Sequence, residues 1–174
     1  MKRTESHEDR PAVAVLGLGN PVLSDDSVGL HVAAEVERLL KEEPLDGVFV
    51  LTSTRAGFEL IDLLCGFTHA LIIDSLETPH PAPGLVRKLD VQGISGSARL
   101  VGVHDIGIGD AFELAATIGV SMPKTVEIYA VEGDDMSTIS EEMTPAVAAA
   151  VAPLARLVLA RAGELALEMK SCFR

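Results

Sequence analysis

The stretch that decides the fold is Val13-Ala-Val-Leu-Gly-Leu-Gly-Asn-Pro-Val-Leu-Ser-Asp-Asp-Ser-Val-Gly29. It begins with the apolar run of a buried strand and continues into a glycine-rich turn. An acidic pair, Asp25 and Asp26, follows at the entrance of a segment with helical periodicity. A short parallel strand delivers the residues after it to the carboxyl edge of an α/β sheet, where such folds place their chemistry.

Apolar runs of strand length alternate with segments of helical period along the rest of the chain. Strands are expected at 12–18, 48–52, 70–74 and 126–131, and the period-two pattern of 84–91 is typical of a half-exposed edge strand. Helices are expected at 28–40, 58–64, 106–118 and from Thr144-Pro145 to about 168. Pro153 lies inside the last helix and is expected to kink it or to mark its true start. The alternation predicts an α/β fold, a three-layer sandwich with a mostly parallel five-stranded sheet and helices on both faces.

Length and charge restrict the class of protein. The chain has 174 residues, enough for one ordinary domain and too few for two well-stabilised ones. We expect a disordered polar tail over residues 1–10 and a single domain over 11–170. The formal net charge of −12 repels a polyanion, so nucleic acid is not expected as a partner.

The apolar runs and the cysteines of the sequence restrict the expected location of the protein and its disulfide bonding. No uninterrupted apolar run reaches the roughly 18 residues that span a bilayer, and the polar N-terminus lacks the apolar middle of a secretory signal. We therefore expect a cytoplasmic protein without membrane insertion, and a monomer. The two cysteines, Cys65 and Cys172, fit neither a disulfide framework nor a spaced zinc motif.

Three side chains that can bind a metal or transfer a proton lie at or just beyond the ends of predicted strands and helices. Asp26 follows the glycine turn, Asp74 ends the third strand, and His104 lies in the loop before the third long helix. The first and third strands can be neighbours in a right-handed crossover sheet, so the two aspartates are expected to approach each other, with His104 closing the triangle. Two carboxylates and an imidazole suit a divalent metal that takes part in chemistry. Two carboxylates can instead share a proton, as in aspartic proteases, and both uses stay open.

Each of these residues also has a plainer interpretation. Asp25 is expected to cap the helix that follows it, and Asp26 could do the same. Asp74 could be a turn former at a strand end, and His104 a polar loop residue. Their joint placement after core strands favours the functional interpretation.

The other histidines and one further carboxylate are expected to take no part in chemistry. Glu132, at the exit of the fifth strand, is expected to be a solvated strand-end charge, and a supporting role in the site stays open. Structural or solvent-facing roles are expected for His7, His31, His69 and His80.

With these residues, the chain resembles the [NiFe]-hydrogenase maturation endopeptidases from Val13 to about Leu159. The family has three motifs in order: a strand with Gly-x-Gly-Asn and an acidic pair, a strand ending in Asp with a later Pro-Gly, and a His before an amphipathic helix followed by Gly and Pro. They appear here as Gly17-Leu-Gly-Asn20 with Asp25-Asp26, Leu71-Ile-Ile-Asp74 with Pro83-Gly84, and His104-Asp-Ile-Gly with Gly119 and Pro123.

The resemblance implies a phosphorylase/hydrolase-like fold and an endopeptidase. The family removes a C-terminal extension from the nickel-loaded precursor of the hydrogenase large subunit by one peptide-bond cleavage. On that view Asp26, Asp74 and His104 contact nickel supplied by the substrate, or another divalent metal at the same site. The two aspartates are also the candidate catalytic residues, and Gly19 and Asn20 are candidates for substrate or metal recognition. Where many relatives have Gly-Ile-Glu-Pro, this chain has Ala130-Val-Glu-Gly133, which leaves a role for the glutamate open.

Two alternatives are weighed against this family. Gly17-Leu-Gly-Asn-Pro21 also resembles the opening of peptidyl-tRNA hydrolases, which continue with a Tyr and an Arg-His-Asn cluster where this chain has Ser24-Asp-Asp-Ser-Val-Gly29. A non-enzymatic nucleotide-sensing or scaffold domain would need a third glycine at the helix entrance and a ribose-binding acid after the second strand. This chain has Asn20-Pro-Val at the helix entrance and Ser53-Thr-Arg55 after the second strand, so the nucleotide-binding fingerprint is absent.

Overall fold

The computed structural model describes residues 12–55, 57–90 and 108–172. Each predicted strand and helix is present, with bounds that differ by a few residues from those expected. In chain order the elements are β1 (Val13–Leu18), a short 3₁₀ helix η1 (Asp25–Ser27), α1 (Val28–Glu42), β2 (Val48–Ser53), α2 (Glu59–Leu64), β3 (His69–Leu76), β4 (Val86–Asp90), α3 (Ile108–Ile118), β5 (Thr125–Glu132) and α4 (Pro145–Cys172).

The five strands form one sheet in the order β2-β1-β3-β5-β4. The pairs β1–β2, β1–β3 and β3–β5 are parallel, and β4 runs antiparallel to β5 at one edge. The prediction of a mostly parallel five-stranded sheet is therefore confirmed. Because β1 and β3 are parallel neighbours, the residues that follow them emerge side by side at the carboxyl edge.

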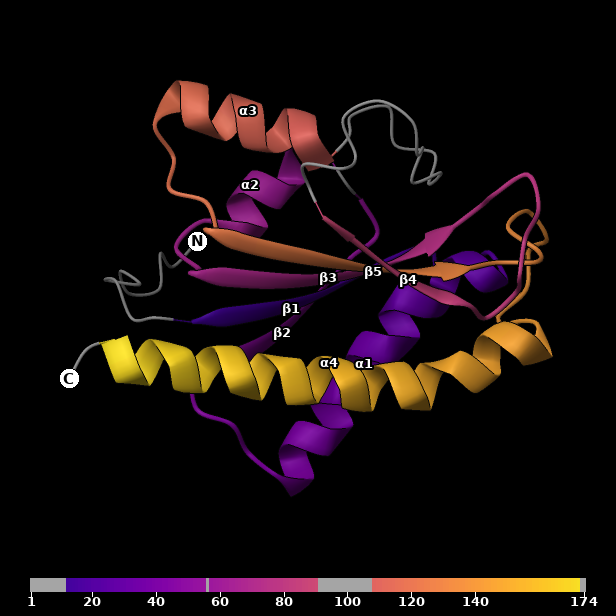
Figure 1. Cartoon of the computed structure of the whole chain (residues 1–174). Helices are drawn as coiled ribbons and strands as arrows, with labels where there is room; N and C mark the ends of the chain where they lie inside the picture. The colour runs from indigo at the N-terminus through magenta and orange to yellow at the C-terminus, as the bar shows by residue number, and fades with distance from the viewer. Residues whose placement is uncertain (1–11, 56, 91–107, 173–174) are drawn as a thin grey trace, which may run out of the picture.

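Helices cover both faces of the sheet, as Figure 1 shows: α1 and α4 on one face, α2 and α3 on the other. Successive strand residues point to opposite faces, so Val13 and Val15 of β1 join the core under α1 and α4. Ala14 and Leu16 join the second core, under α2 and α3. The three-layer sandwich is confirmed.

Two glycines let α1 approach the ends of β1 and β3 very closely. A Cβ atom on Gly29 would lie 2.1 Å from the carbonyl oxygen of Leu18 and 2.5 Å from that of Ile73, and one on Gly17 would lie 2.2 Å from the oxygen of Gly29. No other residue fits these positions without displacing backbone. The close approach fixes the acidic turn before α1 against the carboxyl edge of the sheet.

The last helix runs without interruption from Pro145 through Pro153, so the interpretation of Pro153 as its true start is wrong. Pro153 is exposed, and the carbonyl that its missing N–H leaves free can be solvated. From Pro145 to Lys170 this is the one helix among the described residues with the length and apolar composition to cross a membrane. In the fold its inward side lies against α1 and the sheet, and the buried residues are Val147, Leu154, Ala155, Val158, Ala162, Leu165, Ala166 and Met169.

Candidate active site at the carboxyl edge of the sheet

The structure brings Asp26 and Asp74 together through one serine. Asp26 lies in η1 and is 6% exposed, and Asp74 lies near the end of β3 and is 9% exposed. The backbone N–H of Ser75 donates to Asp74 Oδ1 at 2.8 Å, and its hydroxyl donates to Asp26 Oδ1 at 2.6 Å. The sequence analysis does not single out Ser75, although its place directly after Asp74 in a buried strand is a signal for this bridge.

The two carboxylates have no cationic partner among the described residues. Burial raises the pKa of Asp74 to about 7; the N–H of Ser75 opposes this rise and the neighbouring Asp26 adds to it. A buried carboxyl group with a raised pKa, beside a second acid, is typical of a functional site rather than a structural ion pair. A bound cation or a shared proton would stabilise this arrangement.

The glycine turn holds the backbone of Asp26. The N–H of Asn20 donates to the carbonyl oxygen of Asp26 at 3.1 Å, and a Cβ on Gly19 would lie 2.2 Å from the same oxygen. The Oδ1 atom of Asn20 accepts from the N–H of Val22 at 3.2 Å, closing a local turn. Gly19 and Asn20 thus build the turn, and a role in substrate or metal recognition stays a prediction.

Asp25 does not cap α1, so that expectation is wrong. Its carboxylate is fully buried and faces the loop after β5, where it accepts bonds from the N–H groups of Asp134 and Asp135, both at 2.9 Å. It also accepts from the N–H of Thr144 at 2.7 Å and from the Thr144 hydroxyl at 2.9 Å. A buried carboxylate needs several donors, and this loop supplies four. No local sequence signal shows donors more than a hundred residues away.

Glu132 is not a solvated strand-end charge, which corrects a second expectation. It is fully buried, pairs with Arg87 of β4, and accepts the N–H of Ala82 at 2.5 Å. These bonds, that of Ala82 first, hold the pKa of Glu132 below its usual value. The antiparallel edge strand carries Arg87 to this position, so Glu132 anchors the loop between β3 and β4.

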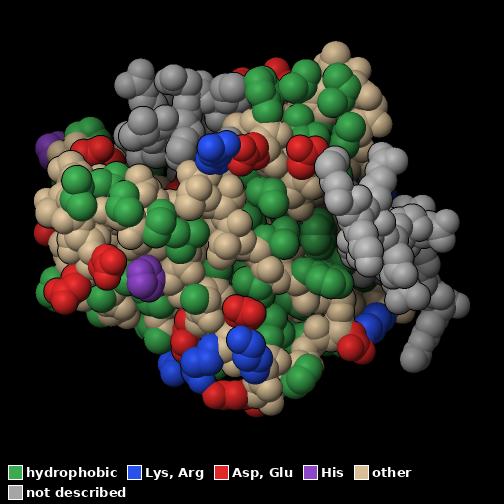
Figure 2. Space-filling view, turned by 180° about the vertical axis from the view of Figure 1, so that it is seen from behind, with side chains coloured by type: hydrophobic (Ala, Val, Ile, Leu, Met, Phe, Trp, Pro, Cys, Tyr) green, Lys and Arg blue, Asp and Glu red, His purple; other side chains and the backbone are tan. Residues whose placement is uncertain are grey.

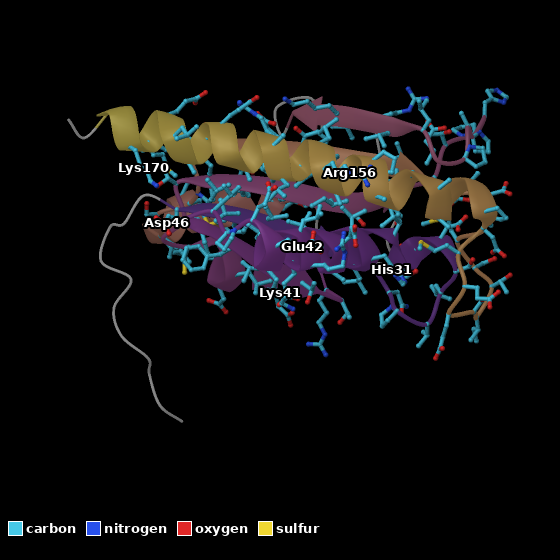
Figure 3. All side chains as sticks on the ribbon, turned by 90° about the horizontal axis from the view of Figure 1, so that it is seen from below. His31, Lys41, Glu42, Asp46, Arg156 and Lys170 are labelled. Carbon is cyan, nitrogen blue, oxygen red and sulfur yellow. The ribbon has the colours of Figure 1, made fainter. Side chains whose placement is uncertain are left out.

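The third predicted ligand, His104, lies outside the described residues, as does His7. The described residues contain no group of three or more His, Cys, Asp or Glu side chains placed to hold a metal. His31 is exposed on α1, in the helical layer seen in Figure 3, and His80 is exposed in the loop after β3. His69 is partly buried at the start of β3, and burial lowers its pKa.

A match to a known protein family identifies the class of protein to which this chain belongs. Residues 30–161, more than half of the chain, match the family model described as hydrogenase maturation protease. The chain is a member of the hydrogenase maturation protease family. It is therefore a hydrolase that cleaves peptide bonds, and the resemblance drawn from the three motifs is confirmed.

Individual members of the hydrogenase maturation protease family are similar over nearly the whole chain. The hydrogenase 2 maturation protease of Escherichia coli K12 is 27% identical over 158 residues, which cover 90% of this chain and 93% of that protein. The structure of the E. coli hydrogenase maturating endopeptidase HybD superposes with a TM-score of 0.71 at 24% identity, covering 88% of this chain and 93% of that one. HybD from Thermococcus kodakarensis gives 0.66 at 22% identity, covering 87% and 99%. These two structures share the fold of this chain.

Proposed function

We propose that this protease removes the C-terminal extension from the nickel-loaded precursor of a [NiFe]-hydrogenase large subunit by one peptide-bond cleavage. Membership of the hydrogenase maturation protease family supports this substrate class. The observation that carries the site is the buried pair of Asp26 and Asp74, bridged by Ser75 and without a cationic partner in the described part of the chain. The carboxylates of this pair can bind a cation that is part of the substrate.

In this proposal nickel belongs to the substrate. Asp26 and Asp74 supply oxygen ligands and His104 supplies a nitrogen ligand, and imidazole and carboxylate together suit a divalent metal of this kind. An incomplete ligand shell binds tightly only when the partner supplies the remaining ligands, so the protease acts on loaded precursor and leaves the unloaded one intact. The same three groups would hold another divalent metal.

When it does not itself hold the metal, Asp74 is a candidate for activating the attacking water. A general base works best when its pKa lies near the operating pH, and burial raises the pKa of Asp74 to about 7. Its Oδ1 atom accepts from Ser75, which leaves Oδ2 for water or metal. Asp26 has the same arrangement, with its Oδ1 atom bonded to the Ser75 hydroxyl. Gly19 and Asn20 border the site from the glycine turn and are proposed to contact the substrate or its metal.

Mass spectrometry of purified large-subunit precursors tests the proposal. Wild-type protein should shorten a nickel-loaded precursor by the mass of its C-terminal extension, and Asp74→Asn and His104→Ala should leave it at full length. Asp62→Asn is the matched control, because Asp62 is an exposed aspartate on α2, and it should process normally. Full processing by Asp74→Asn would remove the site assignment, and efficient trimming of nickel-free precursor would contradict the role of the metal.

A further inference from the structure

Two arginines pair with buried glutamates in different ways. Arg161 uses all three of its nitrogens: Nε and one terminal nitrogen donate to Glu127 at 2.9 and 2.8 Å, and the other terminal nitrogen donates to Glu164 at 2.9 Å. Arg87 of β4 donates to Glu132 through Nε, and no described residue accepts a bond from its two terminal nitrogens. Because each terminal nitrogen of a guanidinium carries two N–H groups, Arg87 has donors that the described part of the chain does not use.

Glu132 fixes the position of the Arg87 side chain. Glu132 is fully buried, and its second carboxylate oxygen accepts the N–H of Ala82 at 2.5 Å, so both of its oxygens are held. The side chain of Arg87 is 46% exposed. Its Nε atom is therefore attached to a buried anchor, while almost half of the side chain stays accessible. An arginine fixed in this way loses little conformational freedom when it binds a further partner.

The register of the sheet places Arg87 in the same row as Asp74. Asp74 of β3 is paired with Ala130 of β5, and Ala130 is paired with Arg87 of β4; the three strands are neighbours in the sheet of Figure 1. Paired residues on neighbouring strands point to the same face, so Asp74 and Arg87 project from one face with the small Ala130 between them. Their backbones are two strand spacings apart, roughly 10 Å, which is the span of about three residues of extended peptide.

The surroundings of Arg87 favour a neutral acceptor over an anion. The segments 18–29, 74–86 and 132–145 border the carboxyl edge and contain nine acidic residues and no lysine or arginine. At the left of Figure 2, where the carboxyl edge lies in that view, acidic side chains are visible beside hydrophobic ones. An anionic group is repelled there, and the pair of Arg87 and Glu132 has no net charge with which to attract one. A main-chain carbonyl oxygen is the neutral acceptor that every peptide substrate carries.

We propose that Arg87 is a substrate-binding residue of this protease, and that its terminal N–H groups donate to a main-chain carbonyl oxygen of the precursor within about three residues of the cleaved bond. The proposal rests on the proposed function and adds to it a residue that aligns the peptide with Asp74. Arg87 moves no proton in this role. Glu132 acts through Arg87 and is a positioning residue.

Steady-state cleavage of nickel-loaded precursor by variants of β4 tests this role. Arg87→Lys keeps a cation for Glu132 but lacks the planar fork of donors. KM should therefore rise about tenfold with kcat within about threefold, because the lost hydrogen bond contributes binding; an arginine that only compensates Glu132 would be replaced by lysine without a change in KM. Lys88→Met is the matched control, since Lys88 is 51% exposed on the same strand and pairs with Glu127 on the opposite face, and it should leave KM unchanged.

The double variant Arg87→Met/Glu132→Gln separates binding from folding. It leaves no unpaired charge and keeps an acceptor for the N–H of Ala82, so the midpoint of urea unfolding should stay close to that of wild type. KM should still rise about tenfold, because the guanidinium donors are gone. An unchanged KM in both Arg87→Lys and the double variant would overturn the role of Arg87 alone, since wild-type cleavage is measured in the same assay. Wild-type protein that cleaves no precursor would overturn the proposed function.

A change in the precursor tests the kind of acceptor. When every Asp and Glu of the C-terminal extension is replaced by Asn or Gln, the difference in KM between wild type and Arg87→Lys should persist, because main-chain carbonyl oxygens are unchanged. Loss of that difference would assign the donors of Arg87 to a side-chain carboxylate and overturn the proposal.

Discussion

Two of the buried acidic sites in the sheet have opposite surroundings. Glu127, near the start of β5, accepts bonds from Arg161 at 2.8 and 2.9 Å and from the Tyr129 hydroxyl at 2.8 Å, and pairs with Lys88 at 3.0 Å. Burial alone would raise the pKa of Glu127, but these partners together outweigh burial and lower it to about 2. Asp74, at the other end of the sheet, receives one N–H bond, lies beside a second acid, and has its pKa raised to about 7.

The difference distinguishes a carboxylate whose charge is compensated from a pair of carboxylates that we propose to be reactive. A buried acid that serves the fold is given cations and donors, because an uncompensated buried charge costs several kcal/mol. The pair of Asp26 and Asp74 lacks this compensation among the described residues, although the chain supplies it at Glu127. The fold thus leaves two buried carboxylates without a cationic partner in the described residues at the carboxyl edge, and supplies cations to Glu127.

The largest expected effect is on catalysis. Asp74→Asn should lower the rate of precursor cleavage by at least about a hundredfold, because it removes a group that binds metal or moves a proton. Glu127→Gln should stay within about threefold of wild type in the same assay. Comparable losses in the two variants would erase the distinction between the two acidic sites.

The two sites should also respond oppositely to pH. The pKa of Asp74 is higher in the folded protein than in the unfolded chain. Ionisation of Asp74 therefore lowers the stability of the fold as pH rises from about 4 to 7, and this effect stays constant above pH 7. One pKa unit corresponds to about 1.4 kcal/mol, so Asp74→Asn should gain on the order of 2 to 4 kcal/mol over wild type at pH 8 and little at pH 4. Urea unfolding at a series of pH values measures this difference, and a pH-independent difference would contradict it.

Removing a cation from the compensated site should cost stability but not activity. Arg161→Met leaves Glu127 with Lys88 and Tyr129, and the free energy of unfolding at pH 7 should fall by about 2 kcal/mol, less than for a deeply buried pair because Arg161 is partly exposed. The contribution of Glu127 is present above about pH 4.5 and is lost as pH falls toward 2, since its folded pKa lies below the unfolded value. Chemical denaturation at pH 7 and pH 3 should show the variant approaching wild type at the lower pH.

The smallest effect is expected at the bridge between the aspartates. Ser75→Ala removes the hydroxyl that bonds Asp26 and keeps the N–H that bonds Asp74. The free energy of unfolding should change by about 1 kcal/mol, the usual contribution of one hydrogen bond, and cleavage should slow by roughly tenfold. A variant as inactive as Asp74→Asn would show that Ser75 itself takes part in the chemistry.

The sequence predicts the sheet well because its signals are local. Alternating apolar strands and periodic helices identify every strand and α-helix of the described residues, and the neighbouring positions of β1 and β3 follow from crossover geometry. The roles of Asp25 and Glu132 could not be read in this way, because their partners come from segments far along the chain or from the register of an edge strand. The expectations for cellular location, monomeric state and domain boundaries stay predictions.

The bonds of Asp25 also affect when the site can form. Its partners lie between residues 134 and 144, so the acidic turn near the beginning of the chain is locked only after most of the polypeptide has been synthesised. A growing chain that ends at β5 already contains Asp26 and Asp74 but lacks the donors that bind the carboxylate of Asp25. The arrangement around Asp25 that the structure describes can therefore form only after the segment before the last helix has been added.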